Sequence, residues 1–227
     1  MKTKRTITRL CVFAFTHSHD LARCGTIAPA QGQSQHHPMN TTTPPPSTQF
    51  CALCGTKVEH RIPADDSRVR AVCPACGHIH YDNPKMVVGT IVSHQGKILL
   101  CQRAIEPGVG KWTLPAGFME CGESTMQGAW RETFEEACAQ VRLIEPVYHM
   151  VDIPHIGQTH LFFRAELDTP EFGAGDETLQ ARLFAPDEIP WEDLVFRSSH
   201  SALRAWIADS VHGVFPTRHV TLEPLVS

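Results

Sequence analysis

Long hydrophobic runs and a strong excess of positive charge are both missing from this sequence. None of its apolar runs approaches the roughly 20 residues that a membrane-spanning helix needs, so we expect no membrane span. The formal net charge is −4, and it is unevenly distributed. Residues 86–227 carry nineteen acidic and ten basic side chains, and so acidic a region needs cations before it can bind an anion well.

The nine cysteines lack the even number and the spacing of a secreted disulfide framework, which predicts a reducing, cytoplasmic compartment. Four of them form the pairs Cys51-x2-Cys54 and Cys73-x2-Cys76, eighteen residues apart, which is zinc-ribbon spacing. Two such turns supply four thiolates and complete a closed tetrahedral site, the structural kind of zinc site. The alternative is a redox dithiol, which usually needs a single pair at the start of a helix.

Residues 1–49 are rich in Gln, His, Ser, Thr and Pro, and we predict that they are disordered. Basic residues precede the apolar run 10–15, which is shorter than the roughly 7 to 15 residues of a secretory signal. A basic transit peptide would direct the chain to an organelle instead of the cytoplasm. Translation from Met39 would remove most of the segment, and the sequence leaves both alternatives open.

From Met86 onward, short apolar runs alternate with turns. Val87–Ser93 and Lys97–Arg103 flank His94-Gln95-Gly96, which predicts a hairpin. Mixed strands with few helices predict an α/β fold, an α/β/α sandwich with a mixed sheet. Further strands are predicted at 147–153, 159–167 and 180–184, and a final helix at 198–209. The predicted division is a disordered segment at 1–49, a zinc ribbon at 50–80, the α/β domain at 81–212 and a tail without a clear role at 213–227.

Three carboxylates lie within five positions, at Glu132, Glu135 and Glu136. On a helix they fall within an arc of roughly 100°, where like charges repel each other. A divalent cation such as Mg²⁺ or Mn²⁺ relieves this repulsion because it prefers hard oxygen ligands. The alternative interpretation is a solvated charged face, which is the usual fate of an isolated acidic pair.

The residues around these acids have the pattern of an amphipathic helix. Ser124 and Gln127 have the form of a capping box at its start. Arg131 can pair with Glu135 one turn later. The face predicted to be buried consists of Met126, Ala129, Trp130, Thr133 and Ala137. The acidic arc lies at the edge of this face, so its carboxylates would be shielded from water but open to a cleft.

This region resembles the Nudix hydrolase signature, Gx5Ex7REUxEExGU. The matching residues are Gly117, Glu123, Arg131, Glu132, Glu135 and Glu136. Thr133 stands at an apolar position, and Cys138 stands where the signature has its last glycine. Glycine suits a left-handed helix end, so Cys138 in that conformation would be strained by about 1–2 kcal/mol.

The resemblance implies metal-dependent hydrolysis of a nucleoside diphosphate linked to another moiety. Arg131 would hold a carboxylate in place beside the metal. Glu135 would act both in catalysis and as a supporting ligand. The ligands that the resemblance implies for Mg²⁺ or Mn²⁺ are Glu132, Glu136, Glu135 and the main-chain carbonyl of Ala116 or Gly117.

Three further side chains complete the predicted site. The family often uses another acid from a loop after the signature, and Glu177 is our choice, with Asp152 and Asp176 as rivals. Arg103, at the end of the predicted hairpin, is expected to contact a phosphate of the substrate. Glu123 is expected to bind substrate or to tether the helix to its preceding loop.

Beyond the signature, the chain is similar to the zinc-ribbon-bearing Nudix group that includes the plant chloroplast FAD and ADP-ribose pyrophosphatase and its bacterial relatives. The motifs that carry this likeness are Cys73-Pro74-Ala75-Cys76-Gly77, Tyr81-x-Asn83-Pro84-Lys85, Trp112–Gly117, Ile156–Thr159 and Phe184–Pro190. The likeness implies cleavage of a small dinucleotide, FAD or ADP-ribose, to AMP plus FMN or ribose 5-phosphate. It also allows a homodimer.

Two other functions compete with this interpretation. NADH pyrophosphatases also carry a zinc ribbon, but their SQPWPFPxS motif is absent from this chain. A ribbon that binds nucleic acid, joined to a domain that only senses a nucleotide, would be a different class of protein. Residues 51–85 carry five basic and four acidic residues, whereas nucleic-acid surfaces are usually strongly basic. Nucleic acid is therefore a poor candidate partner.

Overall fold

The computed structural model describes residues 48–225. The segment predicted to be disordered, residues 1–49, lies outside this range except for its last two residues. Within the described part of the chain, no helix is both long enough and apolar enough to cross a membrane.

The paired cysteines belong to a small antiparallel sheet with the strand order β1-β2-β3. Its strands are β1 (Glu59–Arg61), β2 (Arg70–Val72) and β3 (Ile79–His80). Both cysteine turns read Cys-x-x-Cys-Gly, and Gly55 and Gly77 take positive φ angles of 72° and 74°. Their N–H groups donate to the carbonyls of Cys51 and Cys73 at 2.9 and 3.0 Å. The two turns thus have matching backbones, as a ribbon with paired knuckles requires.

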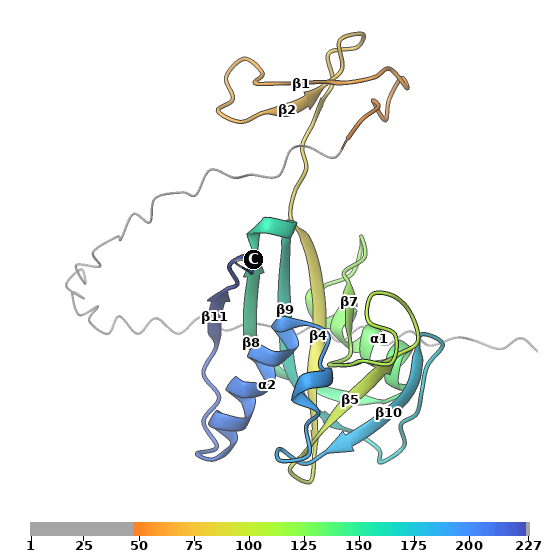
Figure 1. The fold of residues 1–227 in the computed structure, drawn as a ribbon, viewed down its shortest axis with the longest axis vertical. Coiled ribbons are helices and arrows are strands. Elements are labelled where there is room, and N and C mark those ends of the chain that lie inside the picture. Colours follow the sequence, from red (N-terminus) through yellow and green to blue (C-terminus); the bar gives the residue numbers. More distant parts are fainter. Residues whose placement is uncertain (1–47, 226–227) are drawn as a thin grey trace, which may run out of the picture. The chain divides into compact units, whose positions relative to one another are not determined.

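An eight-stranded mixed sheet forms the core of the remaining chain (Figure 1). The strand order is β10-β5-β4-β9-β8-β11, with β6 beside β5 and β7 beside β4. β4 runs parallel to β9 and β11 runs parallel to β8, while the other pairs are antiparallel. The strands are β4 (Lys85–His94), β5 (Lys97–Arg103), β6 (Trp112–Thr113), β7 (Ala116–Phe118), β8 (Val141–Ile153), β9 (Gln158–Leu167), β10 (Thr178–Phe184) and β11 (Arg218–Thr221).

Helices cover both faces of this sheet. The helices are α1 (Thr125–Ala137) and α2 (Arg197–Ser210), with the short 3-10 turns η1 (Pro154–Ile156) and η2 (Trp191–Asp193). Successive residues of a strand point to opposite faces, and β4 is buried on both. Val88 packs with Ala129 of α1, whereas Ile91 packs with Leu203 of α2. The predicted α/β/α sandwich with a mixed sheet is therefore confirmed.

The hairpin strand predicted at Lys97–Arg103 has the same bounds in the structure, but β8 begins six residues earlier than the predicted start at residue 147. Pro146 interrupts the apolar pattern there and cannot donate a ladder hydrogen bond. The pairing of β8 with β9 shifts register between Ile144 and His149, and this irregularity accommodates the proline. The strand therefore continues through a residue that usually ends one.

The tail predicted to lack a clear role contains β11, which pairs with β8. Asp209 of α2, 7% exposed, accepts hydrogen bonds from the Tyr148 hydroxyl at 2.7 Å and from Arg218 Nε at 3.2 Å. Burial alone would raise the pKa of Asp209, but the hydrogen bonds from Arg218 and Tyr148 bring it below the usual value. These contacts join β8, α2 and β11, so part of the tail belongs to the folded domain.

Candidate active site

Helix α1 begins and ends with defined caps. Ser124 Oγ accepts from the Gln127 N–H at 3.2 Å, and Gln127 Oε1 accepts from the Ser124 N–H at 2.8 Å. This reciprocal pair is the predicted capping box. At the other end Cys138 has φ 47° and ψ 26°, and its N–H donates to the Phe134 carbonyl at 2.8 Å. The helix therefore ends in the left-handed conformation expected of the missing glycine.

The buried face of α1 differs from the prediction at Trp130. Its side chain is 42% exposed and stacks on Phe134, with ring centroids 5.5 Å apart. Glu132 is buried in its place, at 9% exposure, because the helix turns this edge toward the glycine-containing strand β7. Ala129, Thr133 and the other small residues of the predicted face do pack on the sheet.

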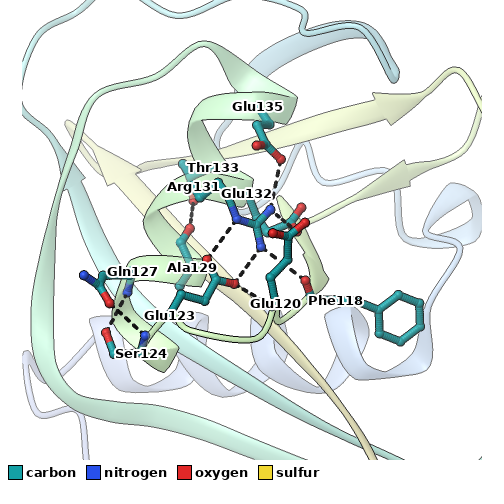
Figure 2. Close-up of polar contacts among 10 residues, drawn as sticks. All are labelled: Phe118, Glu120, Glu123, Ser124, Gln127, Ala129, Arg131, Glu132, Thr133 and Glu135. Carbon is teal, nitrogen blue, oxygen red and sulfur yellow. Dashed lines mark hydrogen bonds and ion pairs between the residues drawn. The ribbon is translucent and has the colours of Figure 1, made fainter.

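Arg131 is the centre of a network of carboxylates (Figure 2). Its Nη1 donates to Glu132 Oε1 at 2.7 Å and to Glu135 Oε2 at 3.0 Å. Its Nε and Nη2 donate to the two oxygens of Glu123 at 3.0 and 2.8 Å, and Nη2 also reaches the Phe118 carbonyl at 3.2 Å. Arg131 therefore fixes Glu132 and Glu135 against the strand that precedes the helix.

The same network shows what Glu123 does. Its carboxylate accepts from Arg131 and from the Glu120 N–H at 2.8 Å, and these hydrogen bonds lower its pKa to about 2. It does not line the cleft described below. Its contacts are those of the predicted tether between helix and loop, and its position does not support the alternative prediction that it binds substrate.

Glu132 and Glu136 are shielded from water. Burial raises the pKa of both, for Glu136 to about 8. Repulsion by Glu132 raises the pKa of Glu136 further, and repulsion by Glu135 raises that of Glu132, while hydrogen bonds from neighbouring donors offset only part of these effects. For Glu136 the donor is the Ala116 N–H, 3.2 Å from Oε2. Buried carboxylates that repel each other favour a cation between or beside them. The donor set therefore fits Mg²⁺ or Mn²⁺.

The structure gives a reason for the glycine at position 117, the first residue of the signature. A Cβ built on Gly117 would collide with the carboxylate of Glu132. A side chain at this position would push the Glu132 carboxylate away from β7, so glycine keeps the carboxylate and the main chain of β7 together. The predicted main-chain ligand at Gly117 is thus next to the predicted side-chain ligand at Glu132.

The loop before β10 is packed against the end of α1. The N–H groups of Gly173 and Gly175 donate to the carbonyls of Ala137 and Glu136 at 2.8 and 3.1 Å. A Cβ on Gly175 would collide with the Glu135 carbonyl, so only glycine permits this close approach. This packing holds the nearby Glu177 beside the acidic helix, where its charge contributes to the raised pKa of Glu136.

One cleft of about 1210 Å³ collects these groups. Its lining includes the predicted residues Arg103, Gly117, Arg131, Glu132, Glu135, Glu136 and Glu177, and also the rival acid Asp176. The other rival, Asp152, is instead bonded to Thr159 at 2.9 Å and to His219 at 2.6 Å, outside the cleft. Arg103 is held by the Pro107 carbonyl, 2.8 Å from Nε, and its guanidinium lies 5.2 Å from the centre of the Phe196 ring.

Sequence reasoning missed the other end of the cleft. Gln158, His160, Ser198 and Ser199 line it, and they come from β9 and from the start of α2. Gln158 belongs to the motif Ile156–Thr159, but no spacing in the sequence connects residue 158 with residue 198. Only the folded sheet and helix bring them together.

The four paired cysteines form the second predicted site. Their sulfur atoms all lie within 4.8 Å of one another, and three of the distances are 3.5, 3.7 and 3.7 Å. A zinc ion with Zn–S bonds of about 2.3 Å would separate its sulfur ligands by about 3.8 Å. The thiols therefore fit a structural zinc site.

Comparison with protein families identifies both parts of the chain. Residues 49–82 match the Nudix N-terminal zinc-ribbon family, and residues 83–207 match the NUDIX domain family. The chain belongs to the Nudix family. The acidic face of α1, with Gly117 before it and Arg131 within it, is therefore the Nudix signature in its folded form.

Several relatives share this Nudix domain. An ADP-ribose pyrophosphatase of Methanocaldococcus jannaschii is 32% identical over 113 residues, which are 48% of this chain and 67% of the relative. An NAD-capped RNA hydrolase NudC of Pseudomonas aeruginosa is 33% identical over 146 residues, 63% of this chain and 49% of the relative. The chain thus spans between half and two thirds of the length of these relatives. Among solved structures, a NUDIX hydrolase from Nitrosomonas europaea is 46% identical with a TM-score of 0.75, covering 78% of this chain and all of that one.

Proposed function

We propose that this Nudix hydrolase cleaves the diphosphate bond of a small dinucleotide, ADP-ribose or FAD, to give AMP plus ribose 5-phosphate or FMN. The observation that carries the proposal is the single cleft that gathers three signature glutamates, Glu177 and Arg103. The similarity to a relative named ADP-ribose pyrophosphatase supports the first substrate. The likeness of the ribbon and the flanking motifs to the FAD and ADP-ribose group supports both.

In this proposal Glu132 and Glu136 would hold Mg²⁺ or Mn²⁺, and Glu135 and the Gly117 carbonyl would be further ligands. The cation supplies neutralisation of the diphosphate charge and an acidified water. Arg131 keeps Glu132 and Glu135 in place through its hydrogen bonds at 2.7 and 3.0 Å. Glu177, on the loop fixed by Gly175, accepts a proton from the attacking water.

Arg103 completes the charge balance of the cleft. Its charge acts on Glu136, and its guanidinium is already held by the Pro107 carbonyl at 2.8 Å. A guanidinium fixed before binding loses little conformational freedom when a phosphate arrives. We assign Arg103 to a phosphate of the substrate.

The homodimer and the cytoplasmic location stay predictions.

NAD(H) is the second candidate substrate, because several relatives are named NAD-capped RNA hydrolase NudC. It has the same AMP half and the same diphosphate, so the metal site would serve it equally well. The distinction between the candidates depends on the group attached to the other phosphate.

The test is a kinetic panel of ADP-ribose, FAD and NADH with Mg²⁺ and with Mn²⁺, scored by AMP release. We expect ADP-ribose or FAD to have the highest kcat/KM. Glu136→Gln should lower kcat by at least about a hundredfold, since an essential ligand charge is lost. The matched control is Glu171→Gln, an exposed glutamate that does not line the cleft, which should keep full activity. No turnover of any of the three with either metal would refute the proposal.

A further inference from the structure

The part of the cleft that is lined by β9 and the start of α2 is polar and mostly buried. His160 is 8% exposed and Ser198 is 2% exposed, while Gln158 is partly buried. His160 Nδ1 lies 2.9 Å from Ser198 Oγ, and His160 Nε2 lies 2.9 Å from Gln158 Oε1. All three residues line the cleft. Buried polar groups arranged in a cavity commonly orient a ligand.

The hydrogen-bond directions of this trio follow from its chemistry. The carbonyl oxygen of Gln158 can only accept, so Nε2 of His160 carries the proton. Burial lowers the pKa of His160 to about 4, so the ring is neutral and Nδ1 accepts from the Ser198 hydroxyl. The lone pairs of Ser198 Oγ remain as acceptors. Among the residues that the structure describes, no protein hydrogen bond uses the amide N–H groups of Gln158.

The sheet register gives the distance of this trio from the metal site. His160 of β9 is opposite Val87 of β4, and Val87 is opposite Phe118 of β7. Directly opposed residues point to the same face, and all three line the cleft. Adjacent strands are about 4.8 Å apart, so His160 lies roughly 10 Å from the strand that carries Gly117. This is the scale that separates a nucleotide's phosphate from its ring.

Apolar side chains surround the trio. Val87 is opposite His160 and Phe118 is opposite Val87 in the sheet, the Phe162 ring lies 6.4 Å from the His160 ring, and Ile156 also lines the cleft. Phe118 and Ile156 are about half exposed, at 52% and 53%, so they present apolar surface to a bound group. A flat ring between apolar walls, with one polar edge, matches this lining better than a sugar, whose hydroxyl groups point in many directions.

We propose that Gln158 and Ser198 recognise the hydrogen-bonding edge of a planar heterocycle of the substrate, with Gln158 as donor and Ser198 as acceptor. His160 is a positioning residue that holds both. The inference rests on the proposed dinucleotide substrate and deepens it. An adenine edge and the pyrimidine edge of a flavin each offer an acceptor beside a donor, so the shared chemistry is that pair of groups.

Gln158→Glu is the sharpest test of this assignment. The glutamate keeps an oxygen for His160 but replaces the free amide donor with an acceptor, which should repel the ring's acceptor. AMP, FMN and inorganic pyrophosphate are titrated against the full-length wild type and variant with Mg²⁺ by calorimetry. We expect the affinity for AMP or for FMN to fall about tenfold or more, because a site built to donate a hydrogen bond is then mismatched.

Inorganic pyrophosphate is the internal control, because it carries the diphosphate charge but no ring. Its affinity should change much less than that of the affected mononucleotide. The mononucleotide whose affinity falls identifies the ring that Gln158 and Ser198 bind. Ser198→Ala should lower the affinity for the same mononucleotide. With the dinucleotide substrate, this variant should raise KM more than it lowers kcat.

Two outcomes would overturn the assignment. One is an unchanged affinity for both mononucleotides in Gln158→Glu, and the other is an equal loss for all three ligands, which would indicate only the added negative charge. If the wild type hydrolysed no dinucleotide, the proposed function would fail. The binding data would still decide whether this end of the cleft reads a ring. Melting temperatures of wild type and variants would show that the fold is intact.

Discussion

Cys138 ends α1 with a backbone conformation that residues other than glycine and asparagine rarely adopt. Its φ of 47° places the Cβ close to a carbonyl oxygen, at a cost of about 1 kcal/mol. The thiol does little to offset that cost, because its one polar contact is a weak one to the Ala174 carbonyl at 3.6 Å. The residue next to the acidic helix face therefore carries strain that the family's glycine would lack.

We predict that Cys138→Gly raises the melting temperature by about 2–4 °C, as expected for relief of about 1 kcal/mol in a domain of this size. Thermal unfolding followed by circular dichroism measures the effect. Cys138→Ala is the matched control, because it removes the thiol but keeps the strained Cβ and should give no such gain. A lower melting temperature for the glycine variant would contradict the strain argument.

At the residue scale, the sequence brought the acidic side chains of the candidate site together, but it did not bring together the polar side chains of the cleft that come from β9 and α2. Glu132, Glu135 and Arg131 are close in sequence on one helix, so their spacing alone places them together. Trp130 was assigned to the wrong face because helical periodicity cannot tell a packed edge from a stacked surface pair. Gln158 and Ser198 come from separate elements, and their meeting depends on the completed sandwich.

At the scale of elements, β8 and β9 carry two histidines into the core. His149 is 1% exposed, with Nε2 2.9 Å from Ser201 Oγ and Nδ1 without a partner among the described residues. Burial lowers the pKa of His149 and of His160 to about 4 from an ordinary value of 6.5. Both histidines are therefore neutral in the folded protein near pH 7.

This burial makes stability depend on pH. In the unfolded chain these histidines bind protons below about pH 6.5, whereas in the folded chain they stay neutral down to about pH 4. The two histidines should therefore lower the free energy of unfolding as the pH drops from 6.5 toward 4, by up to roughly 3 kcal/mol each. Glu136, whose pKa is raised to about 8, contributes in the opposite direction, so the histidine contribution is read from the difference between wild type and a histidine variant.

Urea unfolding at several pH values between 7.5 and 4.5 measures this slope. His149→Gln should make the slope shallower, whereas the exposed His155→Gln should leave it unchanged. The same slope in all three proteins would show that other groups govern acid stability.

Strand prediction succeeded where the pattern was uninterrupted, as at Lys97–Arg103, and failed where tertiary structure overrode it. Pro146 concealed the first part of β8, because the register shift that accommodates it is a property of the pair β8 and β9. The parallel strand β11 could not be foreseen, since four residues without a strong pattern acquire their role only by pairing with β8.

At the scale of the whole molecule, the two candidate metal sites differ in their donor atoms. The cysteine cluster offers four soft thiols in a closed arrangement, and the cleft offers hard carboxylates open to a ligand. We predict that the purified chain binds zinc in equal molar amount. Cys76→Ser should lose that zinc, while Cys121→Ser, at an exposed cysteine outside the cluster, should retain it.

Elemental analysis of the purified proteins measures the zinc content, and titration of the reactive thiols with and without a chelator provides a second reading. The chelator should expose additional thiols in wild type and in Cys121→Ser. Zinc retained by Cys76→Ser at the wild-type level would show that the four thiols are not its ligands.

The short strand β11 has one more consequence, which concerns solution behaviour. Residues His149 to Asp152 of β8 would otherwise present unpaired backbone groups at the margin of the sheet, and β11 pairs with them. Open strand margins are templates for association with other chains. Because β11 is the last strand of the sheet and spans only four residues, it replaces this margin with a very short edge strand, which offers little backbone to another chain.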